Sequence, residues 1–586
     1  MLWTKTLLSA LFLTGTAEAA GRSIAHAGKR HVEHAAKRAK PVMPAGPSQP
    51  VVVEREDKEH KFLNAKTEKF AVDGKGIPDV DFDVGESYSG LLPLSSDPND
   101  ENKLFFWFFP STNPAAEKEI LIWLNGGPGC SSFEGLLQEN GPFLWQYGTY
   151  KPVQNPWSWH TLTNIVYVEQ PVGTGFTTGT PTITNEEELA EQFKGFWKNF
   201  VDTFGMHGYK VYIAGESYAG YYCPYIAAAF LDAEDKTYYD MSGMTIYNPS
   251  LTVDEIQEPI PVVAFTEYWS GLFPFNDTFR ADIKRREKEC GYADFLAEYL
   301  VYPPKGPMPS RLPGTHRDGT TRDECWNIYW DIFDAIMLLN PCFDIYQVAT
   351  TCPLLWDVLG FPGSMPYLPE GASIYFDRED VKRAIHAPPN TTWEECSSDD
   401  VFVNGTDRSP PSTVAALPRV IDGTNNVIIG HSALDMILLA NGTLLALQNM
   451  TWGGQRGFSA RPDQPFYVPQ NNMTTLSTLA AAGVFGSLVS ERGLTYVAID
   501  LAGHMVPQYA PSAAYRHVEY MLGRVDCMNC TKPFTTDPLT PQSDGELGMG
   551  TAPQGWSSAS GHGHGHGHGK GKGKGKGKKG PRRIRA

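Results

Sequence analysis

Six short apolar segments recur along this chain, with longer amphipathic stretches between them. These segments are EILIWLNG, NIVYVEQP, KVYIAGES, MTIYNPS, NNVIIGHS and LTYVAIDLAG. Short and nearly continuous apolar runs are typical of parallel strands that are buried on both faces, and their alternation with helices is typical of an α/β sheet. One intervening stretch, residues 186–204, places its apolar side chains on one helical face. We therefore predict an α/β fold with a mostly parallel central sheet and helices on both of its faces.

The strand pattern is interrupted between residue 254 and about residue 369, where the sequence is rich in aromatic residues, proline and cysteine. Four cysteines lie in this interval: Cys290, Cys325, Cys342 and Cys352. Their spacing is irregular and no histidines accompany them in a ligand pattern, which argues against a zinc site. We predict that the interval is an inserted lid held by disulfides, whose pairing stays open. It lies inside one domain that runs from about residue 61 to residue 523.

The two ends of the chain differ from this domain in composition. Residues 1–19 combine an early lysine, an apolar run and an Ala-Glu-Ala site, which is the pattern of a cleavable signal peptide. Residues 20–60 are predicted to be a basic arm or a pro-segment. Residues 524–586 are predicted to be a C-terminal extension with a disordered tail rich in Gly, His and Lys. No apolar stretch of about twenty residues follows the signal segment, so the sequence predicts no membrane anchor.

Cysteines and glycosylation motifs also indicate the secretory pathway. The chain has nine cysteines and seven Asn-x-Ser/Thr sites, at Asn276, Asn390, Asn404, Asn441, Asn449, Asn472 and Asn529. We expect a secreted, extracellular glycoprotein, with delivery to a vacuole as the alternative. The formal net charge of −17 argues against a nucleic-acid partner. The oligomeric state stays open.

The segment VYIAGESYAG predicts a nucleophilic serine. An apolar strand ends in glycine, serine and small residues, and an apolar helical stretch follows. This strand, sharp turn and helix is the setting that exposes a nucleophilic hydroxyl at the edge of an α/β-hydrolase sheet. The final glycine of the usual Gly-x-Ser-x-Gly pattern is displaced by one position, because Ala219 precedes Gly220. We predict that Ser217 is the nucleophile.

A serine nucleophile needs a base, and the base needs an acid that orients it. In this fold the order along the chain is Ser, then Asp or Glu, then His, and the last two follow strand ends. The segment NNVIIGHSALD places Asp435 after one predicted strand, and LTYVAIDLAGH places His504 after another. By position alone, His431 and Asp500 are alternative candidates.

Four motifs occur here in the order in which they occur in the serine carboxypeptidases. They are WLNGGPGCSS, EQPVGTGF, GESYAG and GHMVPQYAP, and the resemblance spans about Phe62 to Gly523, closest to the secreted fungal branch. The resemblance implies the α/β-hydrolase fold and removal of single residues from the C-termini of peptides and proteins at acidic pH. It implies an acyl-enzyme on Ser217 and no cofactor or metal. An acyltransferase or esterase on the same scaffold is the nearest alternative, and a non-catalytic glycoprotein is a second one.

The resemblance also implies roles for individual residues. The expected catalytic residues are Ser217, Asp435 and His504, and the expected oxyanion-hole donors are the backbone N–H groups of Gly127 and Tyr218. The substrate carboxylate is expected to be bound by Asn125, the N–H of Gly126, Glu139 and Glu216. Met505 is expected to line the pocket for the departing residue, and Cys130 to form a disulfide with Cys396. Several members of the family have a free cysteine three positions after the acid, where this chain has Leu438. Cys223, in the helical segment after the nucleophile, is the candidate unpaired cysteine.

The two glutamates of the expected carboxylate site explain the preference for acid. Two neighbouring, partly desolvated carboxyl groups cannot both ionise at low cost, so at least one pKa is expected to be raised. A protonated Glu139 or Glu216 donates a hydrogen bond to the substrate carboxylate, whereas an ionised one repels it. Peptide binding is therefore expected to weaken as the pH rises.

Overall fold

The computed structural model describes residues 60–353, 355–360, 371–471 and 482–536. The predicted signal peptide, nearly all of the basic arm, the Gly/His/Lys tail and the site Asn472 lie outside these residues. No helix among the described residues is long and apolar enough to cross a membrane.

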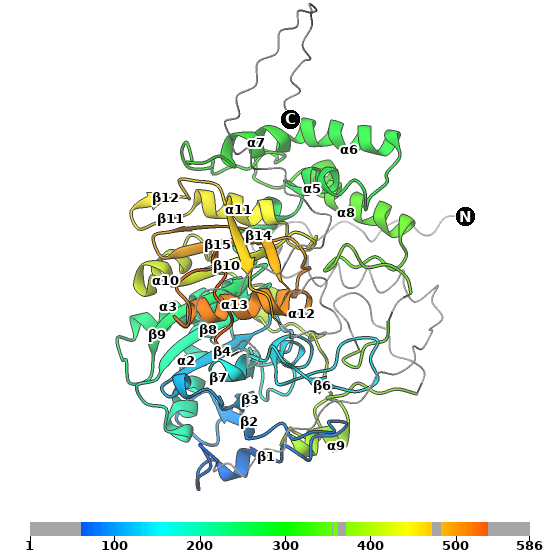
Figure 1. The fold of residues 1–586 in the computed structure, drawn as a ribbon. Coiled ribbons are helices and arrows are strands. Elements are labelled where there is room, and N and C mark those ends of the chain that lie inside the picture. Colours follow the sequence, from blue (N-terminus) through cyan, green and yellow to red (C-terminus); the bar gives the residue numbers. More distant parts are fainter. Residues whose placement is uncertain (1–59, 354, 361–370, 472–481, 537–586) are drawn as a thin grey trace, which may run out of the picture. The chain divides into compact units, whose positions relative to one another are not determined.

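One mixed sheet forms the centre of the described chain. Its strands are β1 (Ala71–Val72), β2 (Ser87–Pro93), β3 (Lys103–Phe109), β4 (Glu119–Leu124), β7 (Asn164–Glu169), β8 (Lys210–Glu216), β9 (Asp240–Tyr247), β10 (Val427–Ser432), β13 (Gln464–Val468), β14 (Gly483–Glu491) and β15 (Leu494–Ile499). They lie in the order β1-β2-β3-β7-β4-β8-β9-β10-β15-β14-β13 (Figure 1). The run from β7 to β15 is parallel, and antiparallel strands extend it at both ends. The six predicted apolar segments are the six parallel strands.

Helices cover both faces of this sheet. The helices are α2 (Glu186–Phe204), α3 (Ala219–Asp232), α4 (Asp254–Gln257), α5 (Val262–Tyr268), α6 (Asp277–Cys290), α7 (Tyr292–Tyr299), α8 (Asp323–Leu339), α9 (Glu379–Ala384), α10 (Leu417–Thr424), α11 (Ala440–Asn449), α12 (Val506–Tyr509) and α13 (Pro511–Met521). A π-helix, η3 (Gly135–Asn140), follows β4. Two short ribbons complete the structure: β5 (Phe143–Leu144) with β6 (Val153–Gln154), and β11 (Thr451–Trp452) with β12 (Gln455–Arg456).

The sheet separates two hydrophobic cores. Along β4, Ile120 and Ile122 face a core that contains α2, α3 and α10, while Leu121 and Trp123 face a core that contains α9 and α13. Every residue of β4 is buried, as expected for a strand covered on both faces. The predicted helix 186–204 is α2, which begins after its N-cap Asn185 and buries its apolar face.

The interval between β9 and α9 contains α4 to α8 and no strand of the sheet among its described residues. Figure 1 shows α5 to α8 gathered at one end of the sheet. The structure pairs its cysteines as Cys290–Cys325 and Cys342–Cys352. These helices have a core of their own, which also includes residues 434, 436–439 and 445.

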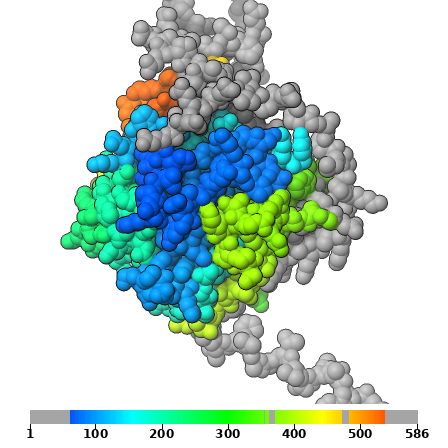
Figure 2. Space-filling model, turned by 90° about the horizontal axis from the view of Figure 1, so that it is seen from below, coloured from blue at the N-terminus to red at the C-terminus, as the bar shows by residue number. Residues whose placement is uncertain are grey.

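Two chain segments outside the parallel core are tied to it. In Figure 2 the N-terminal strands (blue) lie beside the segment that contains α9 (yellow-green), and the Ser89 hydroxyl donates to the Ile385 carbonyl there. Beyond the predicted domain end at residue 523, the described chain remains packed. Phe534 contacts Trp157 and Tyr515.

Candidate active site

Polar residues follow five neighbouring parallel strands at one edge of the sheet. The carboxyl ends of parallel strands lie together, and ligands of α/β proteins bind there. In spatial order, β4, β8, β9, β10 and β15 are followed by Asn125, Ser217, Asn248, Asp435 and His504. The fold therefore brings the predicted serine, aspartate and histidine to the same edge.

Ser217 occupies a strained turn between β8 and α3. Its φ of +62° is unusual for a residue with a side chain, and such strain is typical of functional sites. Small residues are required around it: a Cβ at Gly215 would lie 2.7 Å from the Cβ of Ala219, and one at Gly220 would lie 2.2 Å from the Ser250 carbonyl oxygen. The displaced glycine of the motif is explained by this close approach of Ser250 to α3.

His504 and Asp435 contact each other in the buried site. His504 Nδ1 lies 2.7 Å from Asp435 Oδ2, and the other oxygen, Oδ1, accepts hydrogen bonds from the backbone N–H groups of Ile437 and Leu438. His504 Nε2 is buried and has no hydrogen-bond partner among the described residues. The ring of Tyr346 packs edge-on against the imidazole, with 5.2 Å between the ring centroids. This arrangement fixes the imidazole and leaves Nε2 available.

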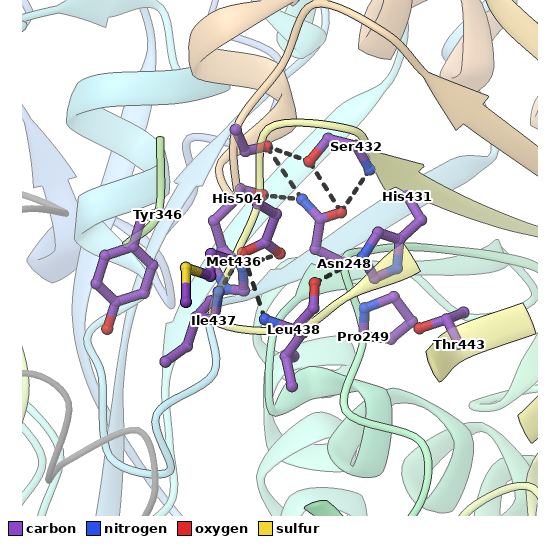
Figure 3. A network of polar contacts seen from close by, with 12 residues as sticks. Asn248, Pro249, Tyr346, His431, Ser432, Met436, Ile437, Leu438, Thr443 and His504 are labelled. Carbon is purple, nitrogen blue, oxygen red and sulfur yellow. Dashed lines mark hydrogen bonds and ion pairs between the residues drawn. The ribbon is translucent and has the colours of Figure 1, made fainter. Parts of the chain in front are cut away.

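Asn248 holds the loop that carries His504 (Figure 3). Its Nδ2 donates to the carbonyl oxygens of Gly503 and His504, and its Oδ1 accepts from the Ser432 backbone N–H at 2.7 Å. The Ser432 hydroxyl lies 2.7 Å from the Gly503 carbonyl oxygen. The sequence prediction did not include Asn248 or Tyr346, because neither belongs to a motif that carries chemistry by itself.

The two alternative candidates lie elsewhere. His431 is buried in β10 with Nε2 2.8 Å from the Leu438 carbonyl oxygen, and burial lowers its pKa to about 4. Asp500 is exposed at the end of β15. Neither forms the contact that joins Asp435 to His504.

The glycine loop after β4 lies directly against the turn that carries Ser217. A Cβ at Gly126 would be 2.4 Å from the backbone nitrogen of Tyr218, and Gly127 has a φ of +113°. A disulfide joins Cys130 of this loop to Cys396. The Tyr218 ring is buried and its hydroxyl donates to Asp407 Oδ2 at 2.7 Å. Only glycine lets the loop backbone come this close to Ser217 and Tyr218.

Three buried carboxyl groups lie next to this loop, where the sequence predicted two. Glu134, Glu139 and Glu216 are 7%, 1% and 3% exposed, and one oxygen of each lies within 4.8 Å of the others. Asn125 Nδ2 donates to Glu134 Oε2 at 2.6 Å and to Glu216 Oε1 at 2.9 Å. Burial raises the pKa of all three groups. For Glu139 and Glu216 the pKa lies well above its usual value, and repulsion from the neighbouring carboxyl groups contributes.

Glu134 is the member of this cluster that the sequence prediction missed. It lies five residues before Glu139, and in an α-helix that interval would separate the two side chains by about 140°. The segment is instead a π-helix, whose hydrogen bonds span five residues, so both carboxyl groups reach the same place. No pattern in this segment of the sequence distinguishes a π-helix from an α-helix.

The remaining predicted residues differ in how far they are buried. Met505 is buried beside His504, and Leu438, three residues after Asp435, is also buried. Cys223 is the free cysteine, and it is buried in α3. Asn276, Asn390, Asn404 and Asn529 are exposed, and Asn441 and Asn449 are half-buried.

Ser217 lies on a strained turn, and an aspartate and a histidine that contact each other follow it in the chain. This arrangement on a mostly parallel sheet defines an enzyme of the α/β-hydrolase class. Comparison with known proteins makes the class specific. The sequence profile of the family described as serine carboxypeptidase matches residues 78–524. A protein of Arthroderma benhamiae named probable serine carboxypeptidase is 55% identical, covering 79% of this chain and 88% of that protein. The serine-type carboxypeptidase F of Aspergillus niger is 46% identical, with 80% and 90% covered.

A solved structure supports the same fold. Kex1(Δ)p, a prohormone-processing carboxypeptidase from Saccharomyces cerevisiae, has a TM-score of 0.61 at 22% identity, with 79% of this chain and 98% of that chain covered. The chain belongs to the serine carboxypeptidase family. It is a serine-type carboxypeptidase with the α/β-hydrolase fold, as the motif resemblance predicted.

Proposed function

We propose that this carboxypeptidase hydrolyses the C-terminal bond of peptides and proteins at acidic pH through an acyl-enzyme on Ser217. The Ser217 hydroxyl attacks the carbonyl carbon of the last peptide bond while His504 Nε2 accepts its proton. His504 then donates this proton to the leaving amine, and the C-terminal residue departs. A water molecule that His504 deprotonates attacks the ester, which releases the shortened peptide and restores the serine. Asp435 keeps Nδ1 protonated, a role that the 2.7 Å contact supports.

The backbone N–H groups of Gly127 and Tyr218 are proposed to stabilise the oxyanion. Each donor of this kind contributes about 3 kcal/mol to transition-state stabilisation. The close contact between Gly126 and Tyr218 supports this proposal, because it places the two donor segments side by side. Met505 is proposed to line the pocket for the departing residue.

The observation that carries the exopeptidase proposal is the buried carboxyl cluster beside Ser217. Glu216 directly precedes the nucleophile, and neither oxygen of Glu139 accepts a hydrogen bond from the described residues. Protonated Glu139 and Glu216, with Asn125 and the Gly126 N–H, provide donors for one terminal carboxylate. Their raised pKa values keep them protonated in acid, and loss of these protons at higher pH replaces donors by repelling charges.

The test compares a blocked dipeptide that has a free C-terminal carboxylate with the same dipeptide as its C-terminal amide. We expect kcat/KM at acidic pH to be about 100-fold or more higher for the free acid. The C-terminal amide carries no negative charge, so it leaves the buried hydrogen-bond donors of the site without a charged acceptor. The alternative, an acyltransferase or esterase, shares the same Ser217 chemistry. Equal rates for acid and amide, or preferential transfer to an added alcohol, would favour that alternative.

The double substitution Glu139→Gln and Glu216→Gln tests the origin of the pH dependence. The amides cannot ionise but still offer N–H donors, so we expect KM for the free-acid peptide to lose most of its rise with pH, while kcat changes little. Measurement of KM and kcat from acidic to neutral pH checks this. A KM that still rises with pH as in the unmodified enzyme would contradict the proposed role of this pair.

The cellular setting is also a proposal. We propose passage through the secretory pathway, a disulfide-bonded lid over residues 254–369 and N-glycosylation of the predicted sites. The four disulfides of the structure support an oxidising compartment, because such bonds are rare in the cytosol.

A further inference from the structure

Glu134 has a position that neither the motif resemblance nor the proposed mechanism uses. It precedes η3, is nearly buried, and shares the carboxyl cluster with Glu139 and Glu216. No lysine or arginine forms an ion pair with these three groups in the described part of the chain. Among the described residues, the hydrogen bonds that these carboxyl groups accept from outside the cluster come from the amide of Asn125.

The orientation of Asn125 is fixed from its other side. Its Oδ1 accepts a hydrogen bond from Trp123 Nε1 at 2.7 Å and lies 3.3 Å from the backbone nitrogen of Gly135. The amide group must therefore point its Nδ2 at Glu134 and Glu216. An asparagine amide has two N–H donors, so both are occupied in the free enzyme. A substrate carboxylate can gain a donor from Asn125 only when one of these glutamates gives it up.

We propose that Glu134 is a third ionisable group of the carboxylate-binding site, and that its ionisation weakens peptide binding. It does so by adding a negative charge and by retaining one N–H of Asn125. This inference rests on the proposed function, because it assumes that the cluster receives the substrate carboxylate. Protonation of Glu134 weakens the hydrogen bond that it accepts from Asn125 and gives Glu134 an O–H donor for the substrate carboxylate. The site therefore binds a carboxylate most strongly when three carboxyl groups, not two, are protonated.

The neighbours of Glu134 set the sign of this effect. Burial raises the pKa of Glu134, whereas the hydrogen bonds from Glu139 and Asn125 and the positive charge of protonated His504 lower it. The negative charge of an ionised Glu134 in turn raises the pKa values of Glu139, Glu216, Asp357 and Tyr509. A negative Glu134 repels the carboxylate of an incoming peptide, and within the described ranges His504 is the single nearby group that can offset this charge. Ionisation of Glu134 is therefore expected to weaken peptide binding.

The test is a set of three single substitutions, assayed as the full chain in the presence of a chelator so that no cation occupies the carboxyl groups. Glu134→Gln keeps an acceptor for Asn125 and removes the charge, and Glu134→Ala removes both. Glu134→Asp retains the charge and serves as the matched control. We expect the Gln variant to bind a free-acid peptide with a KM about tenfold lower than the unmodified enzyme near neutral pH and with a similar KM in acid, where its amide still donates. We expect the Ala variant to show the same weaker rise of KM with pH but a higher KM in acid, because it lacks the donor that protonated Glu134 provides.

The Asp variant and the substrate separate this effect from packing. We expect Glu134→Asp to keep the original rise of KM with pH, and we expect the Gln and Ala variants to leave the kinetics of a C-terminal amide unchanged. An Asp variant that behaves like Ala, or equal effects on acid and amide, would show a packing role and overturn the inference. If the Glu139 and Glu216 variants flatten the profile and Glu134→Gln does not, the inference fails while the proposed function stands. If none of the three groups affects the profile, the proposed carboxylate site fails as well.

Discussion

Substitution of Ser217 by alanine is expected to lower kcat for peptide hydrolysis by about a millionfold, with little change in KM. Alanine removes the only atom that can form the proposed acyl-enzyme, so the water-dependent second step has no substrate. The turn itself is expected to persist, because the positive φ of Ser217 is imposed by β8, α3 and the close contacts of Gly215 and Gly220. Steady-state kinetics with a blocked dipeptide measures the loss.

The control for this experiment is the fold of the variant and its reactivity. Circular dichroism and thermal unfolding should match the unmodified enzyme, and an organophosphonate should label Ser217 in the unmodified enzyme and leave the variant unlabelled. Residual activity within about tenfold of the original would rule out Ser217 as the nucleophile, because no other group replaces a covalent catalyst so efficiently.

Substitution of Asp435 by asparagine is expected to lower kcat by about 10⁴-fold. The backbone N–H groups of Ile437 and Leu438 hold Oδ1, so in the variant they are expected to hold the amide oxygen and to turn the NH₂ group toward His504. His504 Nδ1 would then have to accept a hydrogen bond, which places the proton on Nε2. A protonated Nε2 cannot accept the proton of Ser217.

Asp500→Asn is the matched control, because Asp500 is an exposed aspartate after a parallel strand of the same sheet. It is expected to retain full activity, whereas Asp435→Asn is expected to lose both activity and rapid labelling by an organophosphonate. If Asp500→Asn caused the larger loss, or if both variants stayed active, the assignment of the orienting acid to Asp435 would be wrong.

Local sequence patterns predicted the parallel strands and the helix α2 correctly. Each of the six apolar segments is a parallel strand, and the helical face of residues 186–204 is buried as α2. These predictions succeed because a strand buried on both faces needs an apolar side chain at nearly every position, a requirement that is visible within six or seven residues. The contact between His504 and Asp435 follows from the same frame, since β10 and β15 are neighbours.

The sequence could not choose His504 and Asp435 over His431 and Asp500 without the motif resemblance. All four residues lie at or just beyond the ends of predicted strands. The tertiary structure separates them, because His431 is buried against the Leu438 carbonyl and Asp500 faces solvent. Asn248 was missed for a related reason: its hydrogen bonds join strands that are far apart along the chain.

The amino-acid sequence by itself determined the strands of the sheet and the sharp turn that carries Ser217, because each depends on neighbours in the chain. Only the tertiary structure decided that the carboxyl cluster has three members. Glu134 joins Glu139 because a π-helix changes the angle between residues five apart, and both meet Glu216 because β4 and β8 are adjacent in the sheet. Neither the helix type nor the spatial neighbour is encoded in the spacing of the glutamates.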